Sequence, residues 1–361
     1  MDYPIFFASN RVWRCYTGGA LLDRFVGKTP ELDGHLPEDW LASTVHAANG
    51  THSQGPDEGL TRTILPNGKQ GPLLTDVLKL HTEDILSQKH IAKFADNSGV
   101  LCKYLDSSVR LPIQCHPDAA LAQRLFNSRF GKTECWHIIN VRRIDGQEPY
   151  ILMGFKPGVT REVFAKAAYA EDSAAMEQML HKIPVSPGQT YFVSGRMPHA
   201  IGPGVFMLEV QEPSDLVIAP ERYCADVRLT DKEMWGLLPP EQAIEVFDFT
   251  SQTEAELLGR VFAQHKVIAK TAELEVCEII GKSFTDAFGL RKAIVRGTGR
   301  IELPGAFAII VVEDGHGMIR WAGGEKNIKR GDYFLQPAAL PWLEYQTGQK
   351  LDLLICLPPA A

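Results

Sequence analysis

Short hydrophobic runs alternate with polar residues along most of the chain, and glycine or proline separates one run from the next. Such alternation is typical of half-buried β-strands, whereas apolar residues three or four apart indicate helices. The first part of the chain is predicted to contain strands over Trp40–Val45, Ser98–Asp106, Thr133–Val141, Tyr150–Phe155, Pro184–Ser194 and Val205–Gln211. Helices are predicted over Pro72–Lys79, Ala119–Phe126, Val159–Lys182 and Pro240–Val246.

The chain beyond Ala272 is organised differently, because short strands and Gly- or Pro-containing turns dominate it. Its strongest signals are an apolar run, a hairpin and a closing strand, at Phe307–Val312, Met318–Lys329 and Leu351–Leu357. Many short strands joined by such turns are typical of a sandwich or small barrel. Gly315–Gly317 is predicted to be a turn, and its isolated His316 gives no reason to expect a metal in this half.

Composition excludes several classes of function. The 361 residues are enough for two or three domains, and the net charge of -7 argues against a general affinity for nucleic acid or anionic membranes. The seven cysteines form no C-x-x-C pair, which favours the reducing cytoplasm. We expect no signal peptide and no transmembrane helix, because no apolar stretch has the required length.

Candidate chemistry begins at Gln114 and His116, which lie two residues apart and share one face of an extended segment. Pro117 keeps the residue before it extended, and Asp118 can cap the helix that follows. Glu134 stands on the next predicted strand. An amide oxygen, an imidazole and a carboxylate on neighbouring strands can hold a divalent metal, and His199 downstream offers a fourth ligand.

Each of these residues also has a structural interpretation. A single Gln or His on a strand is more often structural than metal-binding. Lys103 lies within an apolar strand, where a lysine is expected either at the edge of the sheet or with a functional role. Glu209 and Gln211 share a face that is either a second wall of the site or exposed to solvent. We interpret His46 and His52 as polar loop residues, and strand alternation points His137 away from Glu134.

Three motifs resemble those of the type I phosphomannose isomerases of the short bacterial kind. They are Gln114–Asp118, Gly131–Trp136 and Pro198–Gly202, and they occur in the family's order. The segments Asp39–Ala47 and Val185–Gly195 are also similar to strands of that family. The resemblance covers nearly the whole chain.

The resemblance implies a mainly β fold with a helical insertion, built from two cupin-type (jelly-roll) β-barrels and a small α-helical segment. Residues 1–240 would form a catalytic metal-binding cupin domain, with helical insertions around 117–130 and 158–183. Residues 241–361 would form a C-terminal cupin-like barrel.

The resemblance further implies interconversion of mannose 6-phosphate and fructose 6-phosphate with one bound Zn²⁺ per chain. The implied metal ligands are Gln114, His116, Glu134 and His199, and the implied catalytic residues are Lys132, Glu209, Lys103 and Arg222. The family has serine where this chain has Pro112, and arginine where it has Ala219. Arg222 is the nearest replacement for that arginine, and Arg228 lies further on.

Two other functions are weighed against a cytoplasmic sugar-phosphate isomerase. The chain can be a metal-bearing cupin that binds a sugar without isomerising it, which Pro112 and the shifted arginine favour. It can also be an iron-dependent oxygenase, although such sites contain more histidine than Gln/His/Glu/His. The only partner we expect is a small sugar phosphate, and the sequence leaves the oligomeric state undetermined.

Overall fold

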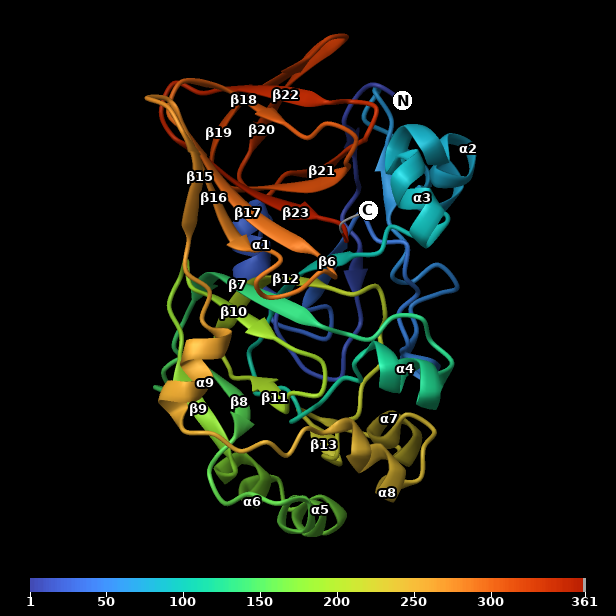
Figure 1. Ribbon diagram of the computed structural model, residues 1–361, viewed down its shortest axis with the longest axis vertical. Helices are drawn as coiled ribbons and strands as arrows, with labels where there is room; N and C mark the ends of the chain where they lie inside the picture. Colours follow the sequence, from blue (N-terminus) through green and yellow to red (C-terminus); the bar gives the residue numbers. More distant parts are fainter. Residues whose placement is uncertain (360–361) are drawn as a thin grey trace.

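Two antiparallel sheets, one above the other along the long axis of the molecule, organise the computed structural model, which describes residues 1–359 (Figure 1). The first sheet has the order β10-β7-β12-β6-β3-β2, and a three-stranded sheet β11-β8-β9 lies below it in the same view. These strands are β2 (Arg11–Val12), β3 (Glu38–Leu41), β6 (Leu101–Asp106), β7 (Glu134–Val141), β8 (Tyr150–Phe155), β9 (Leu180–Pro184), β10 (Thr190–Val193), β11 (His199–Ile201) and β12 (Val205–Gln211).

The second sheet contains ten strands, nine of them from the C-terminal part of the chain. The tenth is β1 (Ile5–Phe6), which pairs with β21 and so carries the N-terminus to the far sheet. The others are β15 (Lys266–Lys270), β16 (Leu274–Ile280), β17 (Gly289–Val295), β18 (Thr298–Glu302), β19 (Ala308–Trp321), β20 (Gly324–Lys329), β21 (Tyr333–Gln336), β22 (Trp342–Gln346) and β23 (Leu351–Leu357). Two small hairpins are β4 (Arg62–Ile64) with β5 (Gln70–Leu73), and β13 (Tyr223–Cys224) with β14 (Val227–Arg228).

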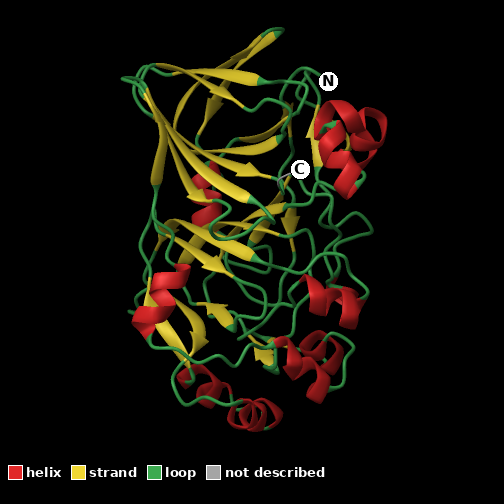
Figure 2. Cartoon of the chain, in the orientation of Figure 1, coloured by secondary structure: helices red, strands yellow, loops and turns green. Residues whose placement is uncertain are grey.

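Most helices lie at the periphery, and four of them gather at the end of the molecule opposite the ten-stranded sheet (Figures 1 and 2). Those four are α5 (Arg161–Tyr169), α6 (Ser173–Gln178), α7 (Asp231–Trp235) and α8 (Pro240–Ala243). The remaining helices are α1 (Ala20–Val26), η1 (Gly50–His52), α2 (Leu74–Leu86), α3 (Gln88–Phe94), α4 (Ala119–Phe126), η2 (Ile244–Val246) and α9 (Glu254–Val261). None of the helices described is long and apolar enough to cross a membrane.

The predicted fold class, mainly β with a helical insertion, is confirmed. Strand pairing among residues 1–359 leaves the sheets open, however, and does not close them into barrels. The division at residue 240 stays a prediction, and residues 360 and 361 of the predicted second domain lie outside the described part.

Three predicted elements were wrong. The strand over Trp40–Val45 ends at Leu41, because the next residue, Ala42, has a positive φ of 48°. The helix over Val159–Lys182 is divided into α5 and α6 and ends before β9, because Glu171 has a positive φ of 55° and Asp172 caps a new helix. Gly315–Gly317 is not a turn but lies inside the long strand β19. Glycine is needed there, since a Cβ at Gly315 would stand 2.1 Å from the carbonyl oxygen of Lys350.

The two large sheets share one hydrophobic core. Alternate residues of β6 and β12, such as Tyr104 and Leu208, pack in the same cluster as Ile309 of β19 and Leu354 of β23. One polar group crosses this junction: the carboxylate of Glu313 on β19 lies 2.9 Å from His137 Nε2 on β7 and 2.5 Å from Lys292 Nζ on β17. His137 thus points away from Glu134, as predicted.

We expect Glu313→Gln to lower the free energy of unfolding at pH 7 by about 2 kcal/mol, the range for a buried hydrogen bond to a charged group. Although burial opposes ionisation, His137 and Lys292 lower the pKa of Glu313 to about 2. Because this pKa is depressed, its stabilisation is complete above about pH 4.3, where the unfolded carboxyl ionises, and is lost as the pH falls toward 2.

Urea titrations of the wild type and Glu313→Gln between pH 7 and pH 3 measure this difference. The difference in the free energy of unfolding between the two proteins should stay constant down to about pH 5 and become smaller below pH 4. An equal difference at every pH would show that the effect comes from packing rather than from charge.

Candidate functional site

The segment Gln114–Asp118 runs between two other parts of the chain that hold it in place. Gln114 and Cys115 form backbone bridges with His199 and Ile218 respectively. Pro117 follows His116, and the Asp118 carboxylate accepts a hydrogen bond from the backbone N–H of Leu121, 2.8 Å away, at the start of α4. The cap predicted from the sequence is therefore confirmed, and His116 stands on a rigid strand-to-helix connection.

Two glycines allow neighbouring loops to close against this segment. A Cβ at Gly131 would lie 2.7 Å from the carbonyl oxygen of Pro117, and one at Gly195 would lie 2.8 Å from Cα of Asp118. Both distances are too short for any other residue. The loops that carry Lys132 and His199 can therefore approach His116 only because glycine precedes them.

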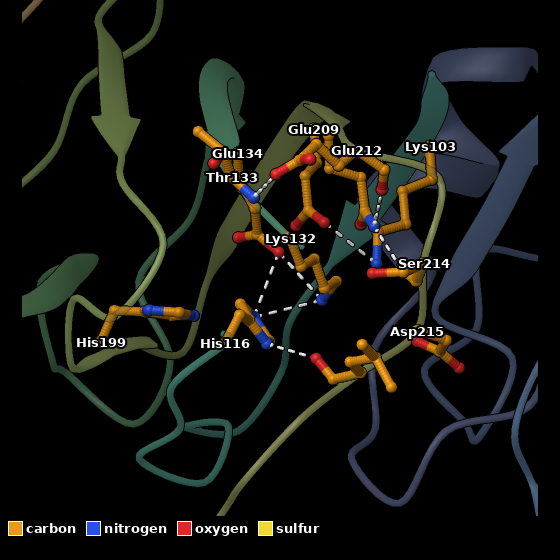
Figure 3. A network of polar contacts seen from close by, with 12 residues as sticks. Lys103, His116, Lys132, Thr133, Glu134, His199, Glu209, Glu212, Ser214 and Asp215 are labelled. Carbon is orange, nitrogen blue, oxygen red and sulfur yellow. Dashed lines mark hydrogen bonds and ion pairs between the residues drawn. The ribbon is translucent and has the colours of Figure 1, made fainter. Parts of the chain in front are cut away.

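Three candidate metal ligands meet at this point. His116 follows the extended segment, Glu134 begins β7 and His199 begins β11, and all three are buried (Figure 3). Their ligand atoms lie within 4.8 Å of one another. Gln114 lines the adjoining cavity, and its backbone N–H donates to the carbonyl oxygen of His199, 2.8 Å away. The structure thus brings three of the four predicted ligands together and places the backbone of Gln114 beside that of His199.

Hydrogen bonds orient both imidazoles toward a shared point. Nδ1 of His116 donates to the carbonyl oxygen of Leu216, and Nδ1 of His199 donates to that of Met197, each at 2.8 Å. In both rings Nε2 is then the nitrogen with a free lone pair. Nε2 of His199 is buried without a hydrogen bond, which is costly unless a ligand satisfies it. Oε1 of Glu134 lies 3.2 Å from Nε2 of His116, on the side of the carboxylate that faces both rings.

The ionisation states also suit a cation. Burial lowers the pKa of His116, and it lowers that of His199 to about 3, so both rings are neutral at pH 7. Burial alone would raise the pKa of Glu134, but Lys132 and His116 hold it well below its usual range. Two neutral imidazoles and a carboxylate are a donor set that zinc accepts. These residues fit a metal ion.

Lys132 lies directly beside the three ligands. Its Nζ is 2.9 Å from Oε1 of Glu134 and 3.1 Å from Nε2 of His116 (Figure 3). The loop that carries it is fixed because the Glu212 carboxylate accepts hydrogen bonds from the backbone N–H groups of Gly131 and Thr133. The ammonium group is therefore held at the edge of the candidate metal site.

A lysine–glutamate pair lies on two adjacent strands of the same sheet. Lys103 of β6 and Glu209 of β12 are paired in register, and Nζ lies 3.0 Å from the carboxylate. β6 lies between β3 and β12, so Lys103 is at no edge and the predicted alternative of an edge position was wrong. The face that carries Glu209 is buried, not exposed to solvent. Burial and the Glu134 carboxylate raise the pKa of Glu209 to about 7.

Sequence reasoning missed Glu38 and Arg14. The Glu38 carboxylate lies 3.7 Å from Lys103 Nζ and 3.0 Å from Nε of Arg14, and Arg14 also pairs with Asp215. Burial opposes ionisation of Glu38, but Arg14 and Lys103 lower its pKa to about 2. Arg14 stands in an apolar run between Trp13 and Cys15, the same signal that singled out Lys103.

Lys132, Lys103 and Glu209 line one cavity of about 780 Å³, which is large enough for a small metabolite. Its wall contains Arg14, Glu38, Lys103, Pro112, Gln114, Lys132, Glu209, Asp215, Ala219 and Arg228, among others. Arg222 is not part of this wall. It lies in a different depression, paired with Glu171 at 2.9 Å and Asp231 at 2.6 Å. The structure therefore separates Arg222 from the other predicted catalytic residues.

Known proteins resemble this chain over nearly its full length. Mannose-6-phosphate isomerase ManA of Bacillus subtilis is 26% identical over 345 residues, which are 93% of this chain and 94% of the relative. The crystal structure of the mannose 6-phosphate isomerase from Bacillus subtilis aligns with a TM-score of 0.75 at 20% identity, covering 98% of this chain and 99% of that one. A mannose 6-phosphate isomerase bound with zinc and yttrium aligns with a TM-score of 0.70 at 14% identity, covering 97% and 98%.

No family model matches the sequence. Fold and side chains together define a mainly β protein with a buried site suited to a metal ion. The relatives carry the name mannose-6-phosphate isomerase, and the solved structures share the fold. The resemblance to type I phosphomannose isomerases that the motifs indicated is thereby confirmed.

We expect His199→Ala to weaken zinc binding by more than about 100-fold. Loss of a group that only hydrogen-bonds to a metal ligand already weakens binding about 10–100-fold, and loss of the ligand itself should cost more. His316→Ala is the matched control, since His316 is exposed on β19 in the other sheet. Zinc retained after dialysis, measured by mass spectrometry of the metal, tests both variants. Equal zinc in His199→Ala and the wild type would remove His199 from the site.

Proposed function

We propose that the chain interconverts mannose 6-phosphate and fructose 6-phosphate by proton transfer between C1 and C2 of the sugar. One observation carries the proposal most directly. A buried His/Glu/His set, with Nε2 of His199 unsatisfied, lies directly beside Lys132. Lys132 lines the same cavity as Lys103 and as Glu209, whose pKa is near neutral. Aldose–ketose isomerisation needs this combination of charge stabilisation and a group that gains and loses a proton at neutral pH.

For the cofactor we propose one Zn²⁺ per chain, with His116, Glu134 and His199 as ligands and Gln114 as the fourth. A zinc ion at this point would polarise the oxygens of the sugar at C1 and C2. Support comes from the neutral imidazoles, from the unsatisfied Nε2 of His199 and from the Glu134 carboxylate beside it. The zinc-containing structure with the same fold is consistent with the choice of metal.

For the proton transfer we propose Glu209 as acid and base. A pKa of about 7 lets this carboxyl take a proton from one carbon and return it to the other without a large penalty in either direction. Lys103 holds the carboxylate in place at 3.0 Å and is itself kept charged: burial opposes its protonation, but Glu209 and Glu38 raise its pKa. Lys103 is therefore a positioning residue in this proposal.

Lys132 is proposed to stabilise negative charge on a sugar oxygen during the reaction. Its ammonium group lies at the cavity wall within 3.1 Å of two proposed zinc ligands, so it is placed beside the oxygens that the zinc would bind. A fixed cation in a buried site stabilises such charge more strongly than one in water.

At the phosphate end we propose Arg228 in place of Arg222. Arg228 follows the β13–β14 turn and lines the cavity, whereas Arg222 is paired with two carboxylates elsewhere. The cytoplasm remains the expected compartment, since all seven cysteines are free.

A second candidate function is a metal-bearing protein that binds a sugar without isomerising it. The observation in its favour is Pro112, which lines the cavity and has neither a hydroxyl nor an N–H group to donate to a phosphate.

The experiment that separates the two functions is an assay of mannose 6-phosphate isomerisation on the zinc-loaded protein, together with Lys132→Ala. The wild type should turn over, and loss of one charge-stabilising group should lower kcat by about 100-fold or more. Lys79→Ala is the control, because Lys79 is two-thirds exposed on α2. A wild type that binds mannose 6-phosphate without turnover would establish the binding function instead, and full turnover in Lys132→Ala would remove Lys132 from the mechanism.

Arg228 and Arg222 offer a matched pair of substitutions. We expect Arg228→Ala to raise KM for mannose 6-phosphate about tenfold or more, since a hydrogen bond to a charged group contributes about 1.5–3 kcal/mol. Arg222→Ala should leave KM unchanged. The opposite result, a higher KM in Arg222→Ala alone, would restore the assignment made from sequence spacing.

A further inference from the structure

Two cysteines, one in the wall of the cavity and one buried behind it, lie outside the proposed catalytic groups. Cys15 belongs to the segment after β2, and Cys224 ends the short strand β13. Both pack in the same hydrophobic cluster, although their positions in the chain are far apart. Cys15 is half-buried and lines the cavity, whereas Cys224 is buried behind it.

Hydrogen bonds hold the two segments against each other. Nδ1 of His35 bonds to the carbonyl oxygen of Arg14 at 2.7 Å, and Nε2 of the same ring lies 2.9 Å from Oδ1 of Asp226. One side chain thus joins the neighbour of Cys15 to the β13–β14 turn that follows Cys224. Tyr16, on the other side of Cys15, donates a hydrogen bond to Glu38. The segments that carry the two cysteines are therefore held against each other by contacts that do not involve sulfur.

The two thiols differ in ionisation. A hydrogen bond from Cys224 lowers the pKa of Cys15, and burial only partly opposes this effect. The same interaction, together with burial, raises the pKa of Cys224. A thiol that ionises more readily and lines a cavity open to a small oxidant is the one that reacts first.

Most other thiols are shielded. Cys102, Cys135 and Cys356 are fully buried in the core shared by the two large sheets, and Cys115 is fully buried among the residues around α5 and α8. Cys277 lies on β16, in the other sheet, with 6% of its surface exposed. Cys15 is the cysteine that a small oxidant reaches through the cavity.

We propose that Cys15 and Cys224 form a reversible disulfide when the protein meets a peroxide. The Cys15 thiolate attacks one oxygen of hydrogen peroxide, the O–O bond breaks, and a sulfenic acid and, after protonation, one water are formed. The Cys224 sulfur then attacks the Cys15 sulfur and displaces the second oxygen as water. Two thiols are oxidised to one disulfide, and one peroxide is reduced to two waters.

The disulfide would also change the cavity, and this part rests on the proposed function. It would fix the segment that carries Arg14 and Tyr16, both bonded to Glu38, to the hairpin that carries Arg228. Displacement of such groups by about 1 Å costs up to about 100-fold in rate. We expect the oxidised protein to isomerise its substrate about tenfold or more slowly, and a thiol reductant to restore the rate.

The test treats the full-length protein with one equivalent of hydrogen peroxide, alkylates the remaining thiols and maps disulfides by mass spectrometry. The expected product is a single cross-link between the peptides of Cys15 and Cys224, removed by dithiothreitol. Cys224→Ser should instead leave a sulfenic acid on Cys15 that dimedone traps. Cys277→Ser is the control and should form the cross-link like the wild type.

The proposal is overturned if Cys15 and Cys224 stay reduced while Cys277 or the core thiols oxidise, or if Cys15→Ser does not prevent the oxidation of Cys224. Because the mapping needs no turnover, its result is independent of the proposed isomerase activity. A mapped disulfide in a protein without isomerase activity would contradict the proposed function alone. A mapped disulfide with unchanged turnover would contradict the effect on the cavity.

Discussion

The burial of four carboxylates beside one cavity is the constraint on which the rest of the site depends. Glu38, Glu134 and Glu209 are buried and Asp215 is half-buried, and a carboxylate removed from solvent is costly unless a cation or hydrogen-bond donor is close. The chain supplies Arg14, Lys103 and Lys132, which lie within 2.9 to 3.7 Å of these groups. None of these three side chains satisfies Nε2 of His199, which is buried without a hydrogen bond beside Glu134 and is where a metal ion would bind.

The register of the paired strands determines which of these charged side chains lie next to each other. Lys103 and Glu209 face each other because β6 and β12 pair in that register, and Trp136 of β7 lies opposite Glu209 on the other side. His116 and His199 come from segments joined by a single backbone bridge at Gln114. Close approach at Gly131 and Gly195 then brings the lysine loop and the histidine loop to the same point. Backbone pairing and close approach at glycine thus place the polar side chains of the site.

Much of this arrangement could be predicted from the sequence. Strand alternation located β7, β8 and β12, and the Asp118 cap located α4. Residue spacing could not show which segments meet, because that depends on non-local pairing. Arg222 was selected by its nearness in sequence to a family position, yet a turn at Ala225, with φ of 49°, carries Arg228 to the cavity instead. The charge on Arg14 was overlooked because its partners, Glu38 and Asp215, are distant in sequence.

The central claim is that one divalent cation completes the cluster of His116, Glu134 and His199. Anomalous diffraction at the zinc absorption edge, from crystals of zinc-loaded protein, tests this claim most directly. The account predicts one strong peak about 2.0–2.2 Å from Nε2 of both histidines and from a carboxylate oxygen of Glu134. A fully loaded crystal whose only peak lies elsewhere, with Lys132 still bonded to Glu134 and His116, would contradict it.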